Sequence, residues 1–344
     1  MAIEIVNPIT HPNWDQLVLA HPNYSFFHSS AWARVLSESY SYTPLYFTIF
    51  DGDEISACLP VMEVKSFVTG KRGVSLPFTD YCEPLINDQS QFEELLAHAT
   101  DYGKKAGWKY VELRGSQAVL RDAKPSIVYL GHTLDLTRGG EKLFAALRDS
   151  TRRNTKKAEK EDIEITVSGA VDSVDSFYDL NQVTRKHHGL PPQPRMFFRA
   201  IHKHILSEGL GFVVLASYRS NPIAASVFFH SGKKALYKYG ASDLEHQRLR
   251  ANNLVMWKAI ERLSKQGFES LCFGRTDMEH DGLRQFKTGW GAAEYPINYY
   301  RHDLRQDKFV AHEQPVNGCS KAIFGKLPIP VLNMIGSLAY RHMG

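Results

Sequence analysis

The chain has 344 residues, of which 43% are hydrophobic, 23% charged and 12% aromatic. This is the composition of a folded globular protein, and at about 100–200 residues per domain the length indicates two domains; disorder, collagen and coiled coil are excluded. The 41 basic and 37 acidic side chains give a net charge of +4, too balanced for a protein that coats nucleic acid, so an anion site must be local.

The cysteines and the N-terminal segment indicate the redox environment and the location of the protein. The four cysteines are far apart and form no C-x-x-C pair: Cys58, Cys82, Cys272 and Cys319. Neither a zinc knuckle nor a disulfide framework is therefore indicated, and we expect reduced thiols and no metal site. Residues 1–15 lack the basic start and apolar stretch of a signal peptide, and no stretch approaches the ~18 apolar residues of a membrane span. These features predict a cytoplasmic protein.

Strand-like and helix-like segments alternate along the chain, which predicts an α/β fold. Residues 45–64 read as two strands around a turn at residues 51–53, and residues 212–230 read as a second hairpin. Each hairpin is followed by a predicted helix and strand, within residues 91–116 in the first half and residues 252–276 in the second.

Both predicted helices end on the same local pattern. Gly107 and Gly267 each follow a lysine two residues earlier and precede an aromatic residue and a strand, as expected of a glycine that caps a helix C-terminus. The shared junction predicts an internal duplication, in which the two halves are copies of one unit. The order hairpin, helix, strand also occurs in unrelated α/β proteins, so a chance repeat is the alternative.

A basic segment opens the second half. From Gly139 a predicted helix starts with apolar residues at helical spacing and continues into a basic run over residues 148–160. Arg152 and Lys156 are four residues apart and share one side of this helix, where two cations could clamp a diphosphate or a nucleic-acid backbone. A solvated helix face is the alternative, but no acidic residue lies between Arg152 and Glu159.

The most specific segment is residues 282–291, Gly-Leu-x-x-Phe-Lys-x-Gly-Trp-Gly. It resembles the G-L-y-x-F-K-x-G-[FW]-G signature of the Fem-type (FemAB) aminoacyltransferases, which build peptidoglycan cross-bridges. Residues 152–158 resemble the basic helix of that family, and residues 239–242 resemble its y-g-a-s turn. Residues 78–84 and 327–330 are similar to a FemAB-related subgroup linked to exopolysaccharide and exosortase gene clusters.

This resemblance implies two tandem GNAT-like domains, residues 1–135 and 136–305, followed by a tail over residues 306–344. In GNAT proteins a glycine-rich R-x-x-G-x-G/A turn before a helix holds the pyrophosphate of coenzyme A through backbone N–H groups. Residues 248–252 occupy that place here without either glycine, which weighs against acetyl-CoA. Peptidoglycan-bridge members often carry a helical hairpin like a tRNA-synthetase arm; no long charged helical pair occurs here, which leaves recognition of aminoacyl-tRNA open.

We therefore predict an acyl- or aminoacyl-transferase that forms an amide on an amine of a cell-envelope or exopolysaccharide precursor, in sugar-nucleotide or lipid-linked form. Attack of the amine builds negative charge on the carbonyl oxygen, which Lys287 is our candidate to stabilise. Asp277 is the nearest carboxylate that could accept the amine proton, and substrate-assisted transfer is equally open. The resemblance implies that cationic and aromatic residues bind the acceptor: Arg152, Lys156, Tyr237, Tyr239, Arg275 and Phe286.

Alternatives remain for the donor and for the activity itself. The donor is open between aminoacyl-tRNA and acyl-CoA, and one alternative is a CoA-dependent N-acyltransferase whose helix start near Asn252 holds the pyrophosphate without glycine. Another is a non-catalytic module that binds an anionic glycan precursor. Phe286 and Lys287 also fit a short surface helix with a core aromatic residue and a solvated lysine.

The tail carries an apolar stripe at helical spacing over residues 331–339, too short to span a bilayer and flanked by Lys321, Lys326 and Arg341. Such an amphipathic helix can make peripheral contact with a membrane that contains acidic lipids. The more common outcome for this pattern is docking on the same domain or on a second subunit.

Overall fold

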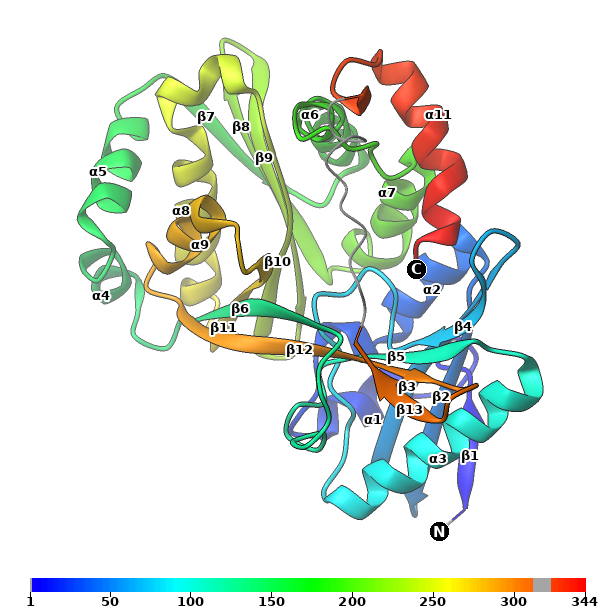
Figure 1. Cartoon of the computed structure of the whole chain (residues 1–344). Helices are drawn as coiled ribbons and strands as arrows, with labels where there is room; N and C mark the ends of the chain where they lie inside the picture. The colour runs from blue at the N-terminus through cyan, green and yellow to red at the C-terminus, as the bar shows by residue number, and fades with distance from the viewer. Residues whose placement is uncertain (1, 312–322) are drawn as a thin grey trace. The chain divides into compact units, whose positions relative to one another are not determined.

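The computed structural model describes residues 2–311 and 323–344 (Figure 1). Its contacts divide the chain into two compact units. Unit 1 holds Met1–Leu130, Pro296–Pro315 and Ala339–Gly344, and unit 2 holds Gly131–Tyr295 and Val316–Leu338. Each unit mixes helices with strands, so the predicted α/β class is confirmed.

Unit 1 is built on a sheet in the order β1-β2-β3-β4-β5-β12, with β13 beside β12. Its strands are β1 (Ile3–Val6), β2 (Thr43–Asp51), β3 (Glu54–Ser66), β4 (Gly70–Val74), β5 (Tyr110–Arg114), β12 (Ala293–Asp303, which begins in unit 2) and β13 (Lys308–Val310). Its helices are α1 (Trp14–Ala20), η1 (Phe26–His28), α2 (Ser30–Tyr40), α3 (Gln89–Ala106) and η4 (Tyr340–His342).

Helix α3 covers one face of the unit 1 sheet, packing on β2, β3 and β5. It begins where the Asp88 side chain accepts a hydrogen bond from the Gln91 N–H, and it ends at Gly107, whose φ of 74° suits glycine. Phe92, Leu95 and other apolar residues of α3 bury their side chains against the strands. This packing supplies the main core of unit 1, because burial of apolar area is the largest favourable contribution to folding.

Unit 2 is built on strands in the order β6-β11-β10-β9-β8-β7. These are β6 (Ile127–Asp135, which begins in unit 1), β7 (Ile163–Ser168), β8 (Gly211–Tyr218), β9 (Asn221–Ser231), β10 (Lys234–Ser242) and β11 (Ser270–Asp277). The helices are α4 (Gly140–Ala145), α5 (Asp149–Ala158), α6 (Val171–His187), α7 (Arg195–Ile201), η2 (His202–Leu206), η3 (Leu244–Leu249), α8 (Ala251–Lys265), α9 (Asp281–Thr288) and α11 (Ile329–Ala339).

Helices cover both faces of the unit 2 sheet. Figure 1 shows α4, α5 and α8 on one face and α6 and α7 on the other. Val255, Ile260 and Leu263 of α8 are fully buried and pack with Phe228 of the sheet, which forms the larger core cluster. The α6 and α7 face is aromatic, with Phe177 and Phe198 buried.

The same order of elements occurs in both units. In unit 1, β2, β3 and β4 pair antiparallel, α3 follows, and β5 pairs parallel with β4. In unit 2, β8, β9 and β10 pair antiparallel, α8 follows, and β11 pairs parallel with β10. Gly107 and Gly267 follow α3 and α8 with φ of 74° and 77°. The repeat is therefore present in the fold, as the shared junction predicts.

The units differ from the continuous ranges 1–135 and 136–305. Residues 299–303 of β12 pair antiparallel with β5, so the chain returns to the unit 1 sheet after completing unit 2. The predicted helix from Gly139 also differs, since it is two helices. Arg148 between them has an extended ψ of 141°, which ends α4 and lets α5 start in a new direction.

The tail is helical as predicted, and its helix packs on its own unit. Leu332 of α11 is fully buried, and Asn333 donates a hydrogen bond to Gln182 of α6. A Cβ at Gly336 would lie 2.0 Å from the Pro192 carbonyl oxygen, so the backbones approach closely there. None of the helices in the described ranges is long and apolar enough to cross a membrane. The predicted flanking Lys321, like Cys319, lies outside the described residues.

Candidate functional site

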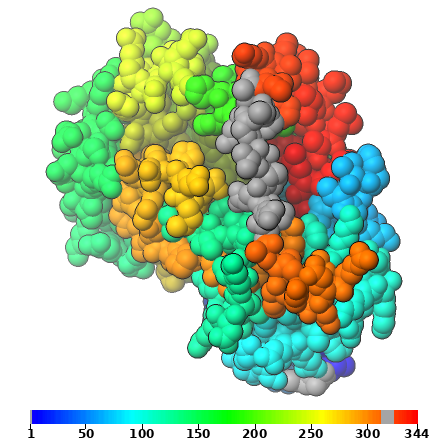
Figure 2. Space-filling view, in the orientation of Figure 1, coloured from blue at the N-terminus to red at the C-terminus, as the bar shows by residue number. Residues whose placement is uncertain are grey.

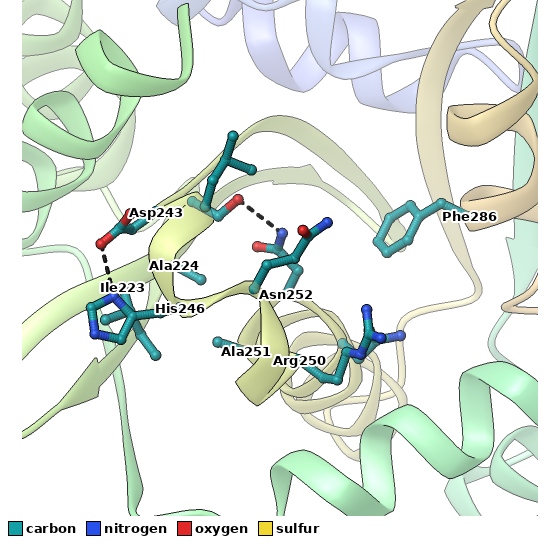
Figure 3. Close-up of a pocket in the computed structure, with 12 residues that line it drawn as sticks. Ile223, Ala224, Asp243, His246, Arg250, Ala251, Asn252 and Phe286 are labelled. Carbon is teal, nitrogen blue, oxygen red and sulfur yellow. Dashed lines mark hydrogen bonds and ion pairs between the residues drawn. The ribbon is translucent and has the colours of Figure 1, made fainter. Parts of the chain in front are cut away.

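A pocket of about 240 Å³ lies in unit 2 where β10 ends and α8 begins (Figure 3). Its walls come from β9, from the η3 segment, from the first turn of α8 and from α9: Ile223, Ala224, Ser242, Asp243, Leu244, His246, Gln247, Arg250, Ala251, Asn252, Asn253 and Phe286. Strands β10 and β11 pair for only three residues, Lys234–Leu236 with Ser270–Cys272, before the register of β10 shifts between Tyr237 and Tyr239. The pocket therefore lies beyond the point where the two parallel strands stop pairing.

One end of the pocket suits an anion. Arg250 precedes α8 with a φ of 59°, in the left-handed region, and no side chain caps this helix within the described chain. Residues 250–253 line the pocket, so the first turn of α8, which carries the positive end of the helix dipole, and the exposed Arg250 both border it. The left-handed conformation that a glycine adopts readily is thus present at residue 250 without a glycine, at a cost of about 1–2 kcal/mol.

Hydrogen-bonding side chains and an aromatic ring also line the pocket. Asp243 Oδ2 lies 2.8 Å from His246 Nδ1, and the Asn252 amide donates to the Ser242 hydroxyl over 3.0 Å. Figure 3 shows the Phe286 ring directed from α9 toward Asn252. An anionic group at Arg250 and a hydroxyl or amide group near Asp243 are therefore the chemistry this pocket can accommodate.

Lys287 lies on the buried side of α9, next to Phe286 in sequence. Its side chain is 2% exposed, and Nζ donates to the carbonyl oxygens of Gly274 at 3.1 Å and Arg275 at 2.9 Å. Gly274 has a φ of 68°, which turns these two carbonyls of β11 toward the ammonium group. The alternative of a solvated lysine on a surface helix is therefore wrong for Lys287.

A second buried group lies beside Lys287. The His132 side chain on β6 is fully buried, and its Nε2 lies 3.1 Å from Glu294 Oε2. Arg284 of α9 donates to both oxygens of Glu294 over 2.7 and 2.6 Å, which lowers the pKa of the Glu294 carboxyl. Burial and then the Lys287 ammonium lower the pKa of His132, so its imidazole is neutral at pH 7.

These charges fix the proton positions on the imidazole. Because Glu294 is ionised, Nε2 of His132 carries the proton and donates it, which leaves Nδ1 as the acceptor. Nδ1 is buried and has no hydrogen-bond partner among residues 2–311 and 323–344. The arrangement is a neutral histidine that a carboxylate orients from one side, with its other nitrogen buried.

The remaining predicted site residues are spread over unit 2. Tyr237 packs on Phe228 and Phe273 in the α8-side core, and burial raises its pKa to about 12. Tyr239 lies on the other face of the sheet, among the phenylalanines of α6 and α7. The register shift between them turns their side chains to opposite faces. The structure therefore does not bring these two tyrosines together.

Arg152 and Lys156 share one side of α5, as their spacing predicts. Arg152 pairs with Asp149 and donates to the Ala145 carbonyl oxygen, while the Lys156 ammonium lies 5.9 Å from the Phe144 ring centroid. The contact with Asp149 stays within the first turn of α5, and the contacts with Ala145 and Phe144 link α5 to α4.

Asp277 is exposed at the end of β11, and Arg275 is half-buried two residues before it.

The structure adds residues that the sequence analysis does not single out. His132 and Glu294 are 162 positions apart and meet only because β6 and β12 come together, so no local signal marks them. Arg250 lies within residues 248–252, which lack the glycines of the R-x-x-G-x-G/A turn, and that departure is the signal that could have marked it. Within the described part of the chain, no group of three His, Cys, Asp or Glu side chains could hold a metal ion.

Comparisons with known proteins agree with this geometry. Residues 145–295 match the family described as Acetyltransferase (GNAT) domain. No sequence among the curated proteins matches the chain. The structure of FemX is similar at a TM-score of 0.72 and 13% identity, over 89% of this chain and 98% of that one.

Two further structures share the fold at lower similarity. A tandem GNAT protein from the clavulanic acid biosynthesis pathway has a TM-score of 0.56 and 10% identity, over 88% of this chain and 99% of that one. L-PGS from Bacillus licheniformis has a TM-score of 0.55 and 10% identity, over 92% and 98%. The predicted tandem GNAT fold and its resemblance to Fem-type proteins are confirmed, and residues 145–295 are the part that matches an acetyltransferase (GNAT) domain.

Proposed function

We propose that the chain is an acyl- or aminoacyl-transferase that forms an amide on an amine of a cell-envelope or exopolysaccharide precursor. This proposal rests on the pocket between β10 and α8, which lies within the segment that matches the GNAT acetyltransferase domain. An acyltransferase needs a place for the phosphate-bearing part of an activated donor, and this pocket has a cationic end.

The donor's phosphate is held by Arg250 and the first turn of α8. A guanidinium binds two phosphate oxygens at once, and the helix dipole adds to the attraction. Acyl-CoA and aminoacyl-tRNA both carry such groups. The position of the pocket at the start of α8 favours the CoA-dependent alternative, because the left-handed backbone at residue 250 keeps the conformation of a glycine turn.

The reaction joins the amine nitrogen to the donor's carbonyl carbon. The carbon–sulfur bond of a thioester, or the carbon–oxygen bond of an ester, then breaks, and one amine proton must leave. Lys287 stabilises the oxyanion that forms between these steps. The proton goes to Asp277 or to a group of the substrate itself.

The acceptor is a sugar-nucleotide or lipid-linked precursor with an amine. Arg152 and Lys156 on α5 are the cations that would bind its diphosphate, with Arg275 and the two tyrosines, Tyr237 and Tyr239, as further proposed contacts. The reaction takes place in the cytoplasm, where both kinds of donor are made. Peripheral membrane contact through the tail would use the exposed Met334 and Leu338 of α11, since Leu332 is buried.

A product assay tests the proposal. The full chain is incubated with acyl-CoAs or aminoacyl-tRNAs and with UDP-linked amino sugars, and mass spectrometry detects the mass gain of an amide product. We expect acyl transfer with wild type and its loss with Lys287→Met. Binding of a precursor without transfer from either kind of donor would instead support the non-catalytic module.

A further inference from the structure

The turn between β3 and β4 in unit 1 presents two apolar side chains to solvent. Phe67 is 88% exposed and Val68 is 64% exposed. Met343 is 56% exposed, and the neighbouring His342 contacts the Phe67 ring with centroids 4.6 Å apart. Figure 2 shows this hairpin, in light blue, at the rim of the surface.

The exposure is built into a rigid turn. The Ser66 hydroxyl accepts hydrogen bonds from the N–H groups of Val68 at 3.1 Å and Thr69 at 2.9 Å. The Thr69 carbonyl oxygen accepts a hydrogen bond from Lys109 Nζ at 2.9 Å, and His342 Nδ1 lies 3.0 Å from the Ser66 hydroxyl. These bonds hold the backbone of the turn that carries Phe67 and Val68.

Cations surround the apolar tip. Lys65 and Lys71 are directly opposite each other on β3 and β4, one position below the turn, and both are exposed. Two like charges at opposed positions of an antiparallel pair are destabilising. Glu63 pairs with Lys65 at 2.8 Å and offsets part of this repulsion, while Lys109 and the exposed Arg341 add positive charge.

We propose that this hairpin tip inserts into the headgroup region of a membrane that contains anionic lipids. Two exposed apolar residues with lysines on the adjoining strands match the two requirements for surface binding, which are an apolar group to enter the boundary and cations to attract the lipid headgroups. A protein partner fits less well, since a stable interface takes about 800 Å² from each side and is depleted in lysine. The tip is separate from the proposed transferase site, and the proposal does not depend on that function.

Vesicle sedimentation tests the proposal on the full chain. The vesicles are phosphatidylcholine alone or equal parts of phosphatidylcholine and phosphatidylglycerol. We expect wild type to pellet only with the phosphatidylglycerol vesicles, less as salt is added. The double variant Phe67→Ser/Val68→Ser should lower the partition coefficient about tenfold or more, and Lys65→Gln/Lys71→Gln should lower it and flatten its salt dependence.

Matched controls separate this surface from others. Met196→Ser removes another exposed apolar side chain, from α7 of unit 2 and 54% exposed, and should bind like wild type. The variant Met334→Ser/Leu338→Ser removes the exposed apolar side chains of α11 and tests whether the tail binds the vesicles. Wild-type protein that stays in the supernatant with both vesicles, or binding that survives Phe67→Ser/Val68→Ser and is lost with Met334→Ser/Leu338→Ser, overturns the proposal.

Fluorescence gives a second readout that does not depend on pelleting. The five tryptophans of the chain are all buried, at most 6% exposed. A Phe67→Trp variant therefore places the one accessible indole of the described residues at the tip. Lipids brominated on their acyl chains should quench its emission in phosphatidylglycerol vesicles. Unquenched emission from vesicle-bound protein would overturn the proposal.

Discussion

The protonation state of His132 depends on its burial and on neighbouring charges. Burial and the Lys287 ammonium both lower its pKa, while Glu294 acts in the opposite direction. Lys287→Met removes the positive charge, so we expect the pKa of His132 to rise toward the ordinary value. Titration of the histidine ring signals by NMR in wild type and variant measures this directly. An unchanged His132 pKa would mean that burial alone accounts for the shift.

The same pKa predicts how stability depends on pH. The unfolded chain takes up a proton on His132 at a higher pH than the folded chain does, because the folded-state pKa is lowered. Folding stability is therefore complete above the ordinary histidine pKa and is lost as pH falls toward the folded-state value. His132→Gln should reduce this loss, measured as the difference between urea unfolding free energies above and below that range. Equal pH dependence in both proteins would contradict the assignment.

Lys287 is a buried hydrogen-bond donor and our proposed oxyanion stabiliser, and separate measurements test the two. If it stabilises an oxyanion, Lys287→Met should lower kcat by about 10²–10³ with much less effect on KM. The same variant leaves the carbonyls of Gly274 and Arg275 without their buried donor, so we also expect a loss of about 1–3 kcal/mol in unfolding free energy. Equal losses in kcat and in substrate affinity would make Lys287 a substrate anchor.

Among the elements, α5 carries a prediction of its own. If its cations bind phosphate, Arg152→Ala/Lys156→Ala should weaken binding of a diphosphate-bearing acceptor and lower its salt dependence, because each phosphate contact releases counterions. Arg153→Ala/Lys157→Ala changes the neighbouring i,i+4 pair, both exposed, and serves as the matched control. Titrations with the acceptor at two salt concentrations measure both the affinity and its salt dependence. Equal effects of the two double variants would show general electrostatic attraction rather than a site.

The elements that could be predicted are those with local signals. The helix ends at Gly107 and Gly267 follow from the glycine that each C-terminus requires, and the hairpins follow from their turns. The helix from Gly139 is broken at Arg148, because packing of Leu143 and Leu147 against unit 2 overrides the continuous helical pattern. Tyr237 and Tyr239 should share a face by strand alternation, but a register shift separates them.

The site was predictable in part for the same reason. Phe286 and Lys287 belong to one short motif, whereas His132, Glu294 and Arg250 do not. The placement of His132 and Glu294 depends on which strands become neighbours, a property with no short-range sequence signature. The signal for Arg250 is the absence of glycine from residues 248–252.

At the scale of the whole molecule, the return of β12 to unit 1 is the main departure from two consecutive domains. Without residues 299–303, strand β5 would keep β4 on one side but lose its partner on the other and expose an unpaired edge. We therefore expect a fragment of residues 1–135 to aggregate or to unfold at a lower temperature than the full chain, measured by gel filtration and circular dichroism. A monomeric fragment with the full chain's melting temperature would show that β12 is dispensable.

The central claim is that this chain binds an activated acyl donor through the pocket at the start of α8. Calorimetric titration with acyl-CoA and with aminoacyl-tRNA, on wild type, Arg250→Ala and Arg248→Ala, tests it most directly. Arg248 is exposed two residues away and does not line the pocket, so it is the matched control. We expect wild type and Arg248→Ala to bind one of the donors with equal affinity, and Arg250→Ala to bind it about tenfold more weakly. Failure of both donors to bind, or equal affinity in Arg250→Ala, would contradict it.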